Sequence, residues 1–252
     1  MTVILALVLA SQIAAAPLDA AHGAVLTALR ADADAGGCDA AALQTAAASA
    51  TIRSLGRAGG DAVVLAQVAA PCVCGAQNCP YLALRLTPGK PRVLFENYGI
   101  TSRTIARGAA LPDVVITAHD SAAIVDETTY AFGGGSYAVV KSERVRVEDG
   151  ARKPNGVPVR FAAGASSAAL HGTTSTGWYD AYTFAANQGQ RVTVTGVSPA
   201  NLSLTLFSPA DSRVTNLKPG VAFVLPRTQT YWLNVESDTA SATPYRLTLA
   251  IR

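Results

Sequence analysis

The stretch that most constrains the fold of this 252-residue chain is GWYDAYTFAANQGQRVTVTG, residues 177–196. It predicts a strand, a tight polar turn at residues 187–189 and a second strand, because Asn and Gly are favoured where a chain reverses direction. From Arg191 to Val197 apolar and polar residues alternate, which is typical of a strand with one buried face and one wet face. The same alternation recurs throughout the chain after Val157.

Strand-like segments follow one another through the C-terminal part at the regular spacing typical of a sandwich. The last segment alternates so that Tyr245, Leu247, Leu249 and Ile251 face inward. We therefore predict an all-β, jelly-roll-like sandwich over residues 158–252. The segments are VPVRFA, SAALHG, YDAYTFA, RVTVTGV, LSLTLFS, GVAFVLP, TYWLNVE and YRLTLAI.

The N-terminal half has a different pattern. Two Ala-rich stretches, Leu18–Arg30 and Asp39–Arg57, carry apolar residues at helical spacing and are separated by Gly36-Gly37. From Ala62 onward the segments are strand-like, and they include YLALRLT, DVVITAHD and SYAVVKSERVRVE. This order predicts an α+β domain with two short helices packed on an antiparallel sheet.

A change of composition marks the expected domain boundary. Residues 149–157, DGARKPNGV, gather Pro, Gly, Asn and charged residues without periodicity, as linkers do. The expected organisation is a signal peptide at 1–16, an α+β domain with a Cys-rich loop at 17–150, a linker at 151–157 and a β-sandwich domain at 158–252. A chain of 252 residues is long enough for each domain to bury a core.

The first residues predict export. The apolar run Val3–Ala10 is too short to span a bilayer, but it suits a signal peptide and is followed by the small residues Ala14–Ala16. A buried N-terminal helix or a misplaced start codon are the alternatives, since no Lys or Arg precedes the run and Pro17 follows the expected cut. The expected location is periplasmic or secreted, with no membrane span after signal removal.

The charge balance argues against a nucleic-acid partner. The chain has 20 Lys and Arg against 17 Asp and Glu, with no basic run that would follow a phosphate backbone. Residues 155–252 alone are mildly basic, with 7 basic and 4 acidic side chains.

All four cysteines lie in the expected first domain. In an exported protein an even number of cysteines indicates disulfides, and four allow three pairings. We favour Cys74 with Cys79 around the short loop GAQN, which leaves Cys38 to meet Cys72. A Cys₄ zinc site is the alternative, although the spacing C-x-C-x₄-C lacks the usual C-x₂-C of such sites.

His119-Asp120-Ser121 contains the three residue types of a hydrolase triad. Neighbouring side chains on a strand point to opposite faces, so they cannot line up as nucleophile, base and orienting acid. His119 and Ser121 could share a face with Asp126 or Glu127 from the next strand. The alternative is that Asp120 and Ser121 shape a turn through hydrogen bonds between their side chains and the backbone, while His119 is a satisfied polar residue.

Four aromatic residues could offer flat ring faces to a sugar, namely Trp178, Tyr179, Tyr182 and Trp232. Alternation sends Tyr182 to the expected core and Tyr179 to the other face. Trp178 lies beside the small residues Ser175, Thr176 and Gly177 at the open end of a strand. Packing in the core or at its rim is the alternative for these rings.

The second half resembles a known family through V-R-F-A-x-G-x-S-S, D-A-Y-T-F-A-A-N-Q-G-Q-R-V-T-V, T-Y-W-L-N-V and Y-R-L-T-L. Over Pro158–Arg252 these motifs resemble the bacterial pre-peptidase C-terminal domain and the related periplasmic inhibitors of g-type lysozyme. The motifs are repeats of turn and strand, so the resemblance bears on the fold more than on activity. The first half is similar to uncharacterised exported bacterial domains through C-G-x-x-x-C-P and D-V-V-I-T-A-H-D-S-A.

These features lead to an expected function. We expect a non-enzymatic exported binding protein, with an envelope protein such as g-type lysozyme, or a glycan, as its partner. The resemblance implies a lysozyme inhibitor that acts through the loop Ser175, Thr176, Gly177, Trp178 and Tyr179. The alternatives are an envelope or glycan adhesion module, and a hydrolase with a site near His119. We expect no catalytic set, metal or cofactor.

Overall fold

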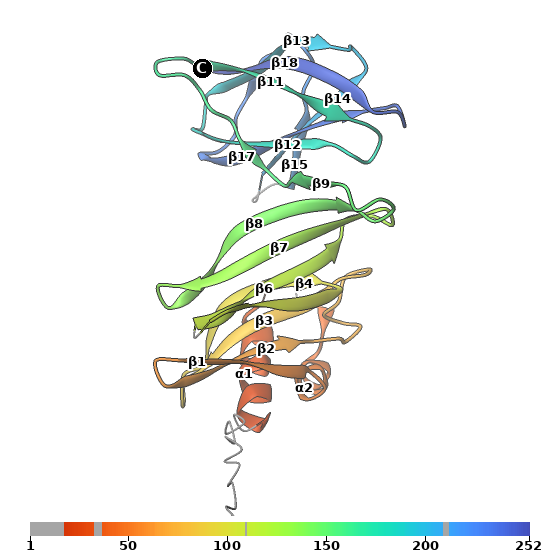
Figure 1. Ribbon diagram of the computed structural model, residues 1–252. Coiled ribbons are helices and arrows are strands. Elements are labelled where there is room, and N and C mark those ends of the chain that lie inside the picture. Colours follow the sequence, from red (N-terminus) through yellow and green to blue (C-terminus); the bar gives the residue numbers. More distant parts are fainter. Residues whose placement is uncertain (1–17, 33–36, 109, 209–211) are drawn as a thin grey trace, which may run out of the picture. The chain divides into compact units, whose positions relative to one another are not determined.

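The computed structural model describes residues 18–32, 37–108, 110–208 and 212–252 (Figure 1). The chain divides into two compact units. Unit 1 runs to His119 and also includes Thr128–Val140, whereas unit 2 comprises Asp120–Glu127 and Lys141–Arg252. The expected signal peptide, residues 1–16, lies outside the described residues.

Two helices open the described chain, α1 (Leu18–Ala31) and α2 (Ala40–Ala48). Asp39 caps α2, because its Oδ1 accepts a hydrogen bond of 2.7 Å from the backbone N–H of Ala42. The second helix is shorter than expected, since residues 51–58 form a strand instead. The β-branched residues at 51 and 52 favour an extended backbone over a helix.

The strands of unit 1 form two sheets, and the second sheet continues into unit 2. The first sheet has the order β1-β2-β3-β4 and is antiparallel, and the second has the order β5-β6-β7-β8-β9. The division between the units crosses β7 and β8. The strands are β1 (Thr51–Ala58), β2 (Asp61–Gln67), β3 (Cys79–Leu86), β4 (Arg92–Gly99), β5 (Thr101–Arg107), β6 (Ala110–His119), β7 (Ile124–Gly133), β8 (Ser136–Arg146) and β9 (Arg152–Pro154).

Both faces of the first sheet are buried in unit 1. On one face Val64 and Leu82 pack with Val25 and other helical residues, so α1 and α2 cover this face (Figure 1). On the other face Val63, Leu65 and Ala83 share a core with residues of the second sheet, including Ile116. The expected antiparallel sheet beneath two helices is therefore present, and a second sheet adds a further layer.

Two disulfides join Cys38 to Cys72 and Cys74 to Cys79, the pairing favoured from the sequence. The first connects the segment before α2 to the loop between β2 and β3. Because all four sulfur atoms are in disulfides, the alternative of a Cys₄ zinc site is wrong.

Unit 2 is built from two further sheets, which form a sandwich-like arrangement. Their orders are β10-β12-β17-β14-β15 and β11-β18-β13-β16, and one core contains residues of both, including Phe184 and Leu249. The strands are β10 (Val157–Pro158), β11 (Ser167–Thr174), β12 (Asp180–Ala186), β13 (Arg191–Ser198), β14 (Leu202–Ser208), β15 (Ser212–Asn216), β16 (Phe223–Val224), β17 (Gln229–Ser237) and β18 (Thr243–Ile251).

The segment expected to be a linker carries two short strands. Arg152–Pro154 pairs with β8 as β9, and Val157–Pro158 pairs in parallel with β12 as β10. Residues 151–157 belong to unit 2, and the chain passes from one unit to the other after His119, Glu127 and Val140. That residues 158–252 fold alone stays a prediction.

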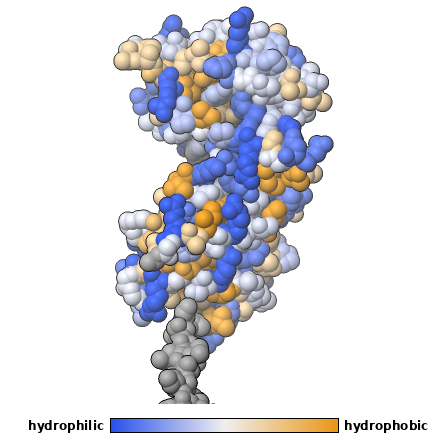
Figure 2. All heavy atoms as spheres, in the orientation of Figure 1, coloured by the Kyte–Doolittle hydropathy of each residue, from blue (hydrophilic) through white to orange (hydrophobic). Residues whose placement is uncertain are grey.

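Two observations concern the surface. On the face seen in Figure 2, apolar residues are interspersed with hydrophilic ones in both units, without one large apolar patch of the kind that marks many interfaces. Within the described part of the chain, no helix has both the length and the apolar character needed to cross a membrane.

Candidate functional site

Residues 175–179 join β11 to β12, and therefore one sheet of unit 2 to the other, and Ser175 and Trp178 pair across a two-residue turn within them. The backbone N–H of Ser175 donates to the carbonyl of Trp178 at 3.2 Å, and the N–H of Trp178 donates to the carbonyl of Ser175 at 2.9 Å. Thr176 and Gly177 form the tip, and Gly177 has a φ of 71°, in the left-handed region that favours glycine. We call Ser175–Trp178 the crossover turn.

The crossover turn is held against the end of β17 and the loop that follows it. The N–H of Thr176 donates to the carbonyl of Thr239 at 2.8 Å, and its hydroxyl donates to the carbonyl of Ser237 at 3.3 Å. The N–H of Gly177 donates to Glu236 Oε1. From within, the buried hydroxyl of Thr174 donates to the carbonyl of Trp178 at 2.6 Å. The backbone of the tip is therefore held by hydrogen bonds within the protein itself, without a bound partner.

The five residues expected to bind differ in exposure. Thr176 and Gly177 are exposed, Tyr179 is half-buried, and Ser175 and Trp178 are only 7% and 8% exposed. Trp178 thus packs within unit 2 and does not project from it. Phe184 and Tyr182 lie in the core, as the alternation of this strand predicts.

Positive charges lie over the two aromatic rings at the end of the turn. The guanidinium carbon of Arg144 lies 3.4 Å from the ring centroid of Tyr179. The guanidinium carbon of Arg146 and the Nζ of Lys153 lie 4.6 Å and 5.2 Å from the ring centroid of Trp178. At such distances cations are attracted to ring faces, so these rings support the turn.

Arg144 is also the centre of a charged cluster. Its side chain is 1% exposed, and its Nε lies 3.8 Å from both Asp120 Oδ2 and Asp126 Oδ1. Its Nη1 donates to the carbonyl of Tyr179 at 3.2 Å, and its Nη2 donates to Asn155 Oδ1 at 3.5 Å. The cluster therefore joins the start of β12 to β7 and to the loop before β7.

Burial changes the protonation of this cluster. Burial raises the pKa of Asp126 to about 6; Arg144 opposes this shift, and the charge of Asp120 adds to it. Burial also raises the pKa of Tyr179 to about 12, and again Arg144 acts in the opposite direction. Asp126 is therefore a group whose charge changes close to neutral pH.

A second polar network lies beneath the turn. Lys153 Nζ donates to Asp180 Oδ1 at 2.7 Å, Tyr245 donates its hydroxyl proton to Asp180 Oδ2 at 2.7 Å, and the hydroxyls of Tyr245 and Tyr182 are 2.6 Å apart. Burial raises the pKa of Tyr245 above its ordinary value, and its bonds to Tyr182 and Asp180 raise it further. A Cβ at Gly172 would lie 2.0 Å from Asp180 Oδ2, so this network requires glycine there.

A pocket of about 460 Å³ opens beside the crossover turn. Ser175, Thr176, Gly177 and Trp178 line it, so the structure brings together four of the five expected binding residues; Tyr179 is not part of the lining. Among the charged residues that line it, Arg146 and Lys153 are paired with carboxylates outside the lining, at 2.9 Å and 2.7 Å.

Glu148 also lines this pocket, and its negative charge is unpaired among the described residues. Its carboxylate is exposed and makes no ion pair or hydrogen bond with any other described residue. The mouth of the pocket therefore offers hydroxyls, fixed backbone and one free carboxylate, which suits a polar or basic group of a partner.

The candidate hydrolase residues His119, Asp120 and Ser121 make structural hydrogen bonds, each within its own unit. In unit 1 the backbone of His119 is paired with the Asn78 side-chain amide, at 2.8 Å and 2.9 Å. In unit 2 the backbone N–H groups of Asp120 and Ser121 donate to the carbonyl of Ile124, at 3.1 Å and 3.0 Å, so this turn is made by backbone hydrogen bonds and not by the side-chain hydrogen bonds expected from the sequence. Across the described residues, no group of three or more His, Cys, Asp or Glu could hold a metal ion.

The cations that support the turn were not among the site residues expected from the sequence. Arg144 and Arg146 alternate with valines in SERVRVE, and this spacing places both arginines on one face of a strand. That signal could have identified them as partners for an aromatic pair. Lys153 lies in the segment expected to be a linker, and nothing in the sequence pointed to its role.

Comparison with known proteins gives partial likenesses. No family model matches the chain, and no curated protein matches it. Among solved structures, PliG of Salmonella Typhimurium, a periplasmic inhibitor of g-type lysozyme, is 27% identical with a TM-score of 0.35; the match covers 40% of this chain and 100% of that one. For PliG of Aeromonas hydrophila the identity is 28%, the TM-score 0.34, and the coverage 38% and 96%.

A galactanase also matches in part. The exo-beta-1,3-galactanase of Phanerochaete chrysosporium is 8% identical with a TM-score of 0.21, covering 81% of this chain and 68% of that one.

Proposed function

We propose that this protein is a non-enzymatic, exported binding protein that presents its crossover turn to a partner protein, and that the partner is a g-type lysozyme. Thr176 and Gly177, which are exposed, would contact the partner, and the buried Ser175 would hold the base of the turn. Trp178 and Tyr179 would act behind them, by holding the tip in place under the cations described above. The sequence motifs of Pro158–Arg252 that resemble lysozyme inhibitors supply the choice of partner.

One observation carries the proposal. The tip of the crossover turn is exposed at Thr176 and Gly177, while its backbone is fixed by hydrogen bonds to Ser237, Thr239 and Glu236. A contact surface that is ordered in advance loses little conformational entropy on binding. A small, rigid and polar tip is the kind of element that can enter a sugar-binding cleft.

Charge favours a g-type partner over a c-type one. Residues 155–252 carry 7 basic and 4 acidic side chains, so a strongly basic lysozyme would gain no electrostatic steering from this region. Many lysozymes are basic, and a less basic g-type enzyme avoids this repulsion. The free carboxylate of Glu148 offers a local site for one basic group of the partner.

Two features of the chain support export. The apolar run Val3–Ala10 has the pattern of a signal peptide, and disulfides such as Cys38–Cys72 persist in oxidising compartments. A periplasmic or secreted location would place the protein where lysozyme acts.

A direct binding measurement tests the proposal. Thr176→Arg adds bulk and charge at the tip, and we expect it to weaken binding to immobilised g-type lysozyme at least tenfold in biolayer interferometry. Gln188→Arg is the matched control, because Gln188 is also exposed on a tight turn of unit 2. Equal affinity of both variants, or no binding of the unaltered protein, would exclude the proposed contact.

A further inference from the structure

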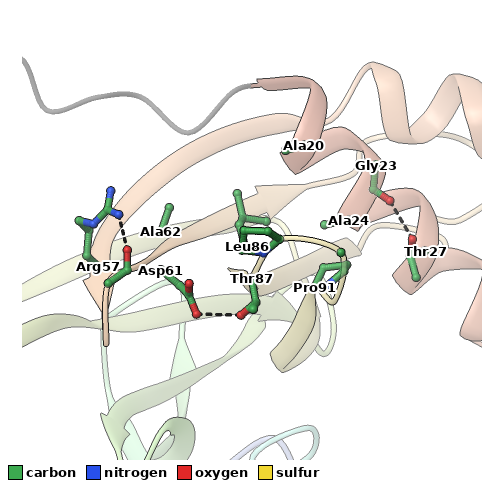
Figure 3. A pocket seen from close by; sticks show the side chains of 13 residues that line it. Ala20, Gly23, Ala24, Thr27, Arg57, Asp61, Ala62, Leu86, Thr87 and Pro91 are labelled. Carbon is green, nitrogen blue, oxygen red and sulfur yellow. Dashed lines mark hydrogen bonds between the residues drawn. The ribbon is translucent and has the colours of Figure 1, made fainter.

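A separate pocket lies in unit 1, between α1 and the ends of two hairpins (Figure 3). Its volume is about 700 Å³, within the range of about 300–1,000 Å³ that small-molecule sites occupy. The β1–β2 turn and the β3–β4 turn form its other walls. Ala24, Ala62, Leu86 and Pro91 give it a largely apolar lining without aromatic rings.

The pocket exists because α1 carries small residues on the side that lines it. Gly23 is the least expected of these, since glycine is among the least favourable residues inside a helix. A Cβ at Gly23 would meet no atom within 4 Å, and no positive φ calls for glycine there. The space beside Gly23 is therefore open, and a larger side chain at this position would extend into the groove.

The positively charged side chain of Arg57 lies at one end of this groove. In Figure 3, Arg57 lies at one end, Leu86 lies in the middle, and Pro91 and Thr27 lie toward the other end. The guanidinium of Arg57 bonds to the carbonyl of Gly60 in its own turn, and this uses only part of its five N–H donors. Arg57 is exposed, and these remaining donors can reach a ligand at the mouth of the groove.

The negative charge of Asp61, the carboxylate that lines the pocket, is already balanced by the positive charge of Arg85. Asp61 Oδ2 accepts hydrogen bonds of 2.8 Å from Arg85 Nε and from the hydroxyl of Thr87. These bonds, that from Thr87 most, hold the pKa of Asp61 below its ordinary value. The charge left for a ligand is therefore the positive charge of Arg57.

We propose that this groove binds a fatty acid, an unbranched aliphatic chain with a carboxylate at one end. The chain would lie along Ala24, Ala62 and Leu86, where burial of its methylene groups is favourable. The carboxylate would pair with the guanidinium of Arg57, whose planar fork matches the two carboxylate oxygens. This site is independent of the crossover turn.

Isothermal titration calorimetry with dodecanoate tests the proposal on the full mature chain. We expect saturable binding at one site, at least tenfold tighter than that of dodecyltrimethylammonium, which has the same chain and the opposite charge. Gly23→Leu should fill the groove and weaken dodecanoate binding at least tenfold, while raising the thermal midpoint because leucine favours the helix. Arg57→Gln should weaken dodecanoate binding about tenfold. The same substitution should leave the affinity for dodecyltrimethylammonium unchanged.

Ala41→Leu is the matched control, because it adds the same side chain on an exposed position of α2 outside the pocket. Its dodecanoate affinity should equal that of the unaltered protein. Absence of binding, or binding that survives Gly23→Leu, would overturn the site. Equal binding of the two detergents, or no effect of Arg57→Gln on dodecanoate, would overturn the role of the carboxylate.

Discussion

In unit 1 two disulfides hold the loop between β2 and β3, whereas in unit 2, which has no cysteine, hydrogen bonds and charges hold the turn between β11 and β12. The first kind of bond acts largely on the unfolded chain, because a crosslink limits the conformations that the chain can adopt. The second kind acts only in the folded state, and it depends on close fit and on protonation. The two units should therefore respond to different perturbations.

Removal of a disulfide should have the largest effect, and it should be confined to unit 1. Cys38 and Cys72 are 34 residues apart, and for a loop of this length the chain-entropy model gives about 4 kcal/mol. We expect the double variant Cys38→Ser, Cys72→Ser to lose this much unfolding free energy in unit 1. Chemical denaturation, monitored in each unit by hydrogen exchange, measures this loss of unfolding free energy. An equal loss in unit 2 would contradict the expected difference between the units.

In unit 2 we expect the corresponding loss of stability from overpacking at Gly172. An added Cβ would lie 2.0 Å from Asp180 Oδ2 and 2.8 Å from the Tyr245 hydroxyl, so the polar network must move. We expect Gly172→Ala to cost about 3 kcal/mol, at the upper end of overpacking effects. Gly133→Ala, whose Cβ would meet nothing within 4 Å, is the control for differential scanning calorimetry. A midpoint for Gly172→Ala equal to that of the control would contradict the network's role.

The smallest expected effect is a dependence of unit 2 on pH. Asp126 has a folded-state pKa of about 6 against an ordinary value of 3.8, so the folded state binds the proton more tightly. Its contribution to stability is therefore fully present below about pH 4 and is lost as the pH rises through 6. Since the Asp126 side chain is 27% exposed, we expect a loss of roughly 1 kcal/mol. Denaturation of Asp126→Asn between pH 4 and 7 should lack this decline.

Local patterns in the sequence predicted much of the fold. The alternation at residues 191–197 corresponds to β13, and the short spacing between Cys74 and Cys79 corresponds to an observed disulfide. The expected helix at residues 39–57 was too long, because its Ala-rich start hid the β-branched pair Thr51 and Ile52. The short strand β15, Ser212–Asn216, was missed because its residues are mostly polar and show little periodicity.

The candidate site was less accessible to sequence reasoning. The small residues and Gly177 indicated a turn at Ser175–Trp178, but not what holds it. Arg144 meets Tyr179 from 35 positions away in the chain. Contacts at this separation depend on how strands of different sheets are brought together, which periodicity does not specify.

Inhibition of lysozyme tests the central claim most directly. In a clearing assay on peptidoglycan, excess purified protein should slow lysis by a g-type lysozyme and leave lysis by a c-type lysozyme unchanged. Trp178→Ala and Tyr179→Ala should weaken inhibition more than the surface change Arg213→Ala, because the first two remove the rings that support the crossover turn. Undiminished lysis by both types of lysozyme would contradict the account.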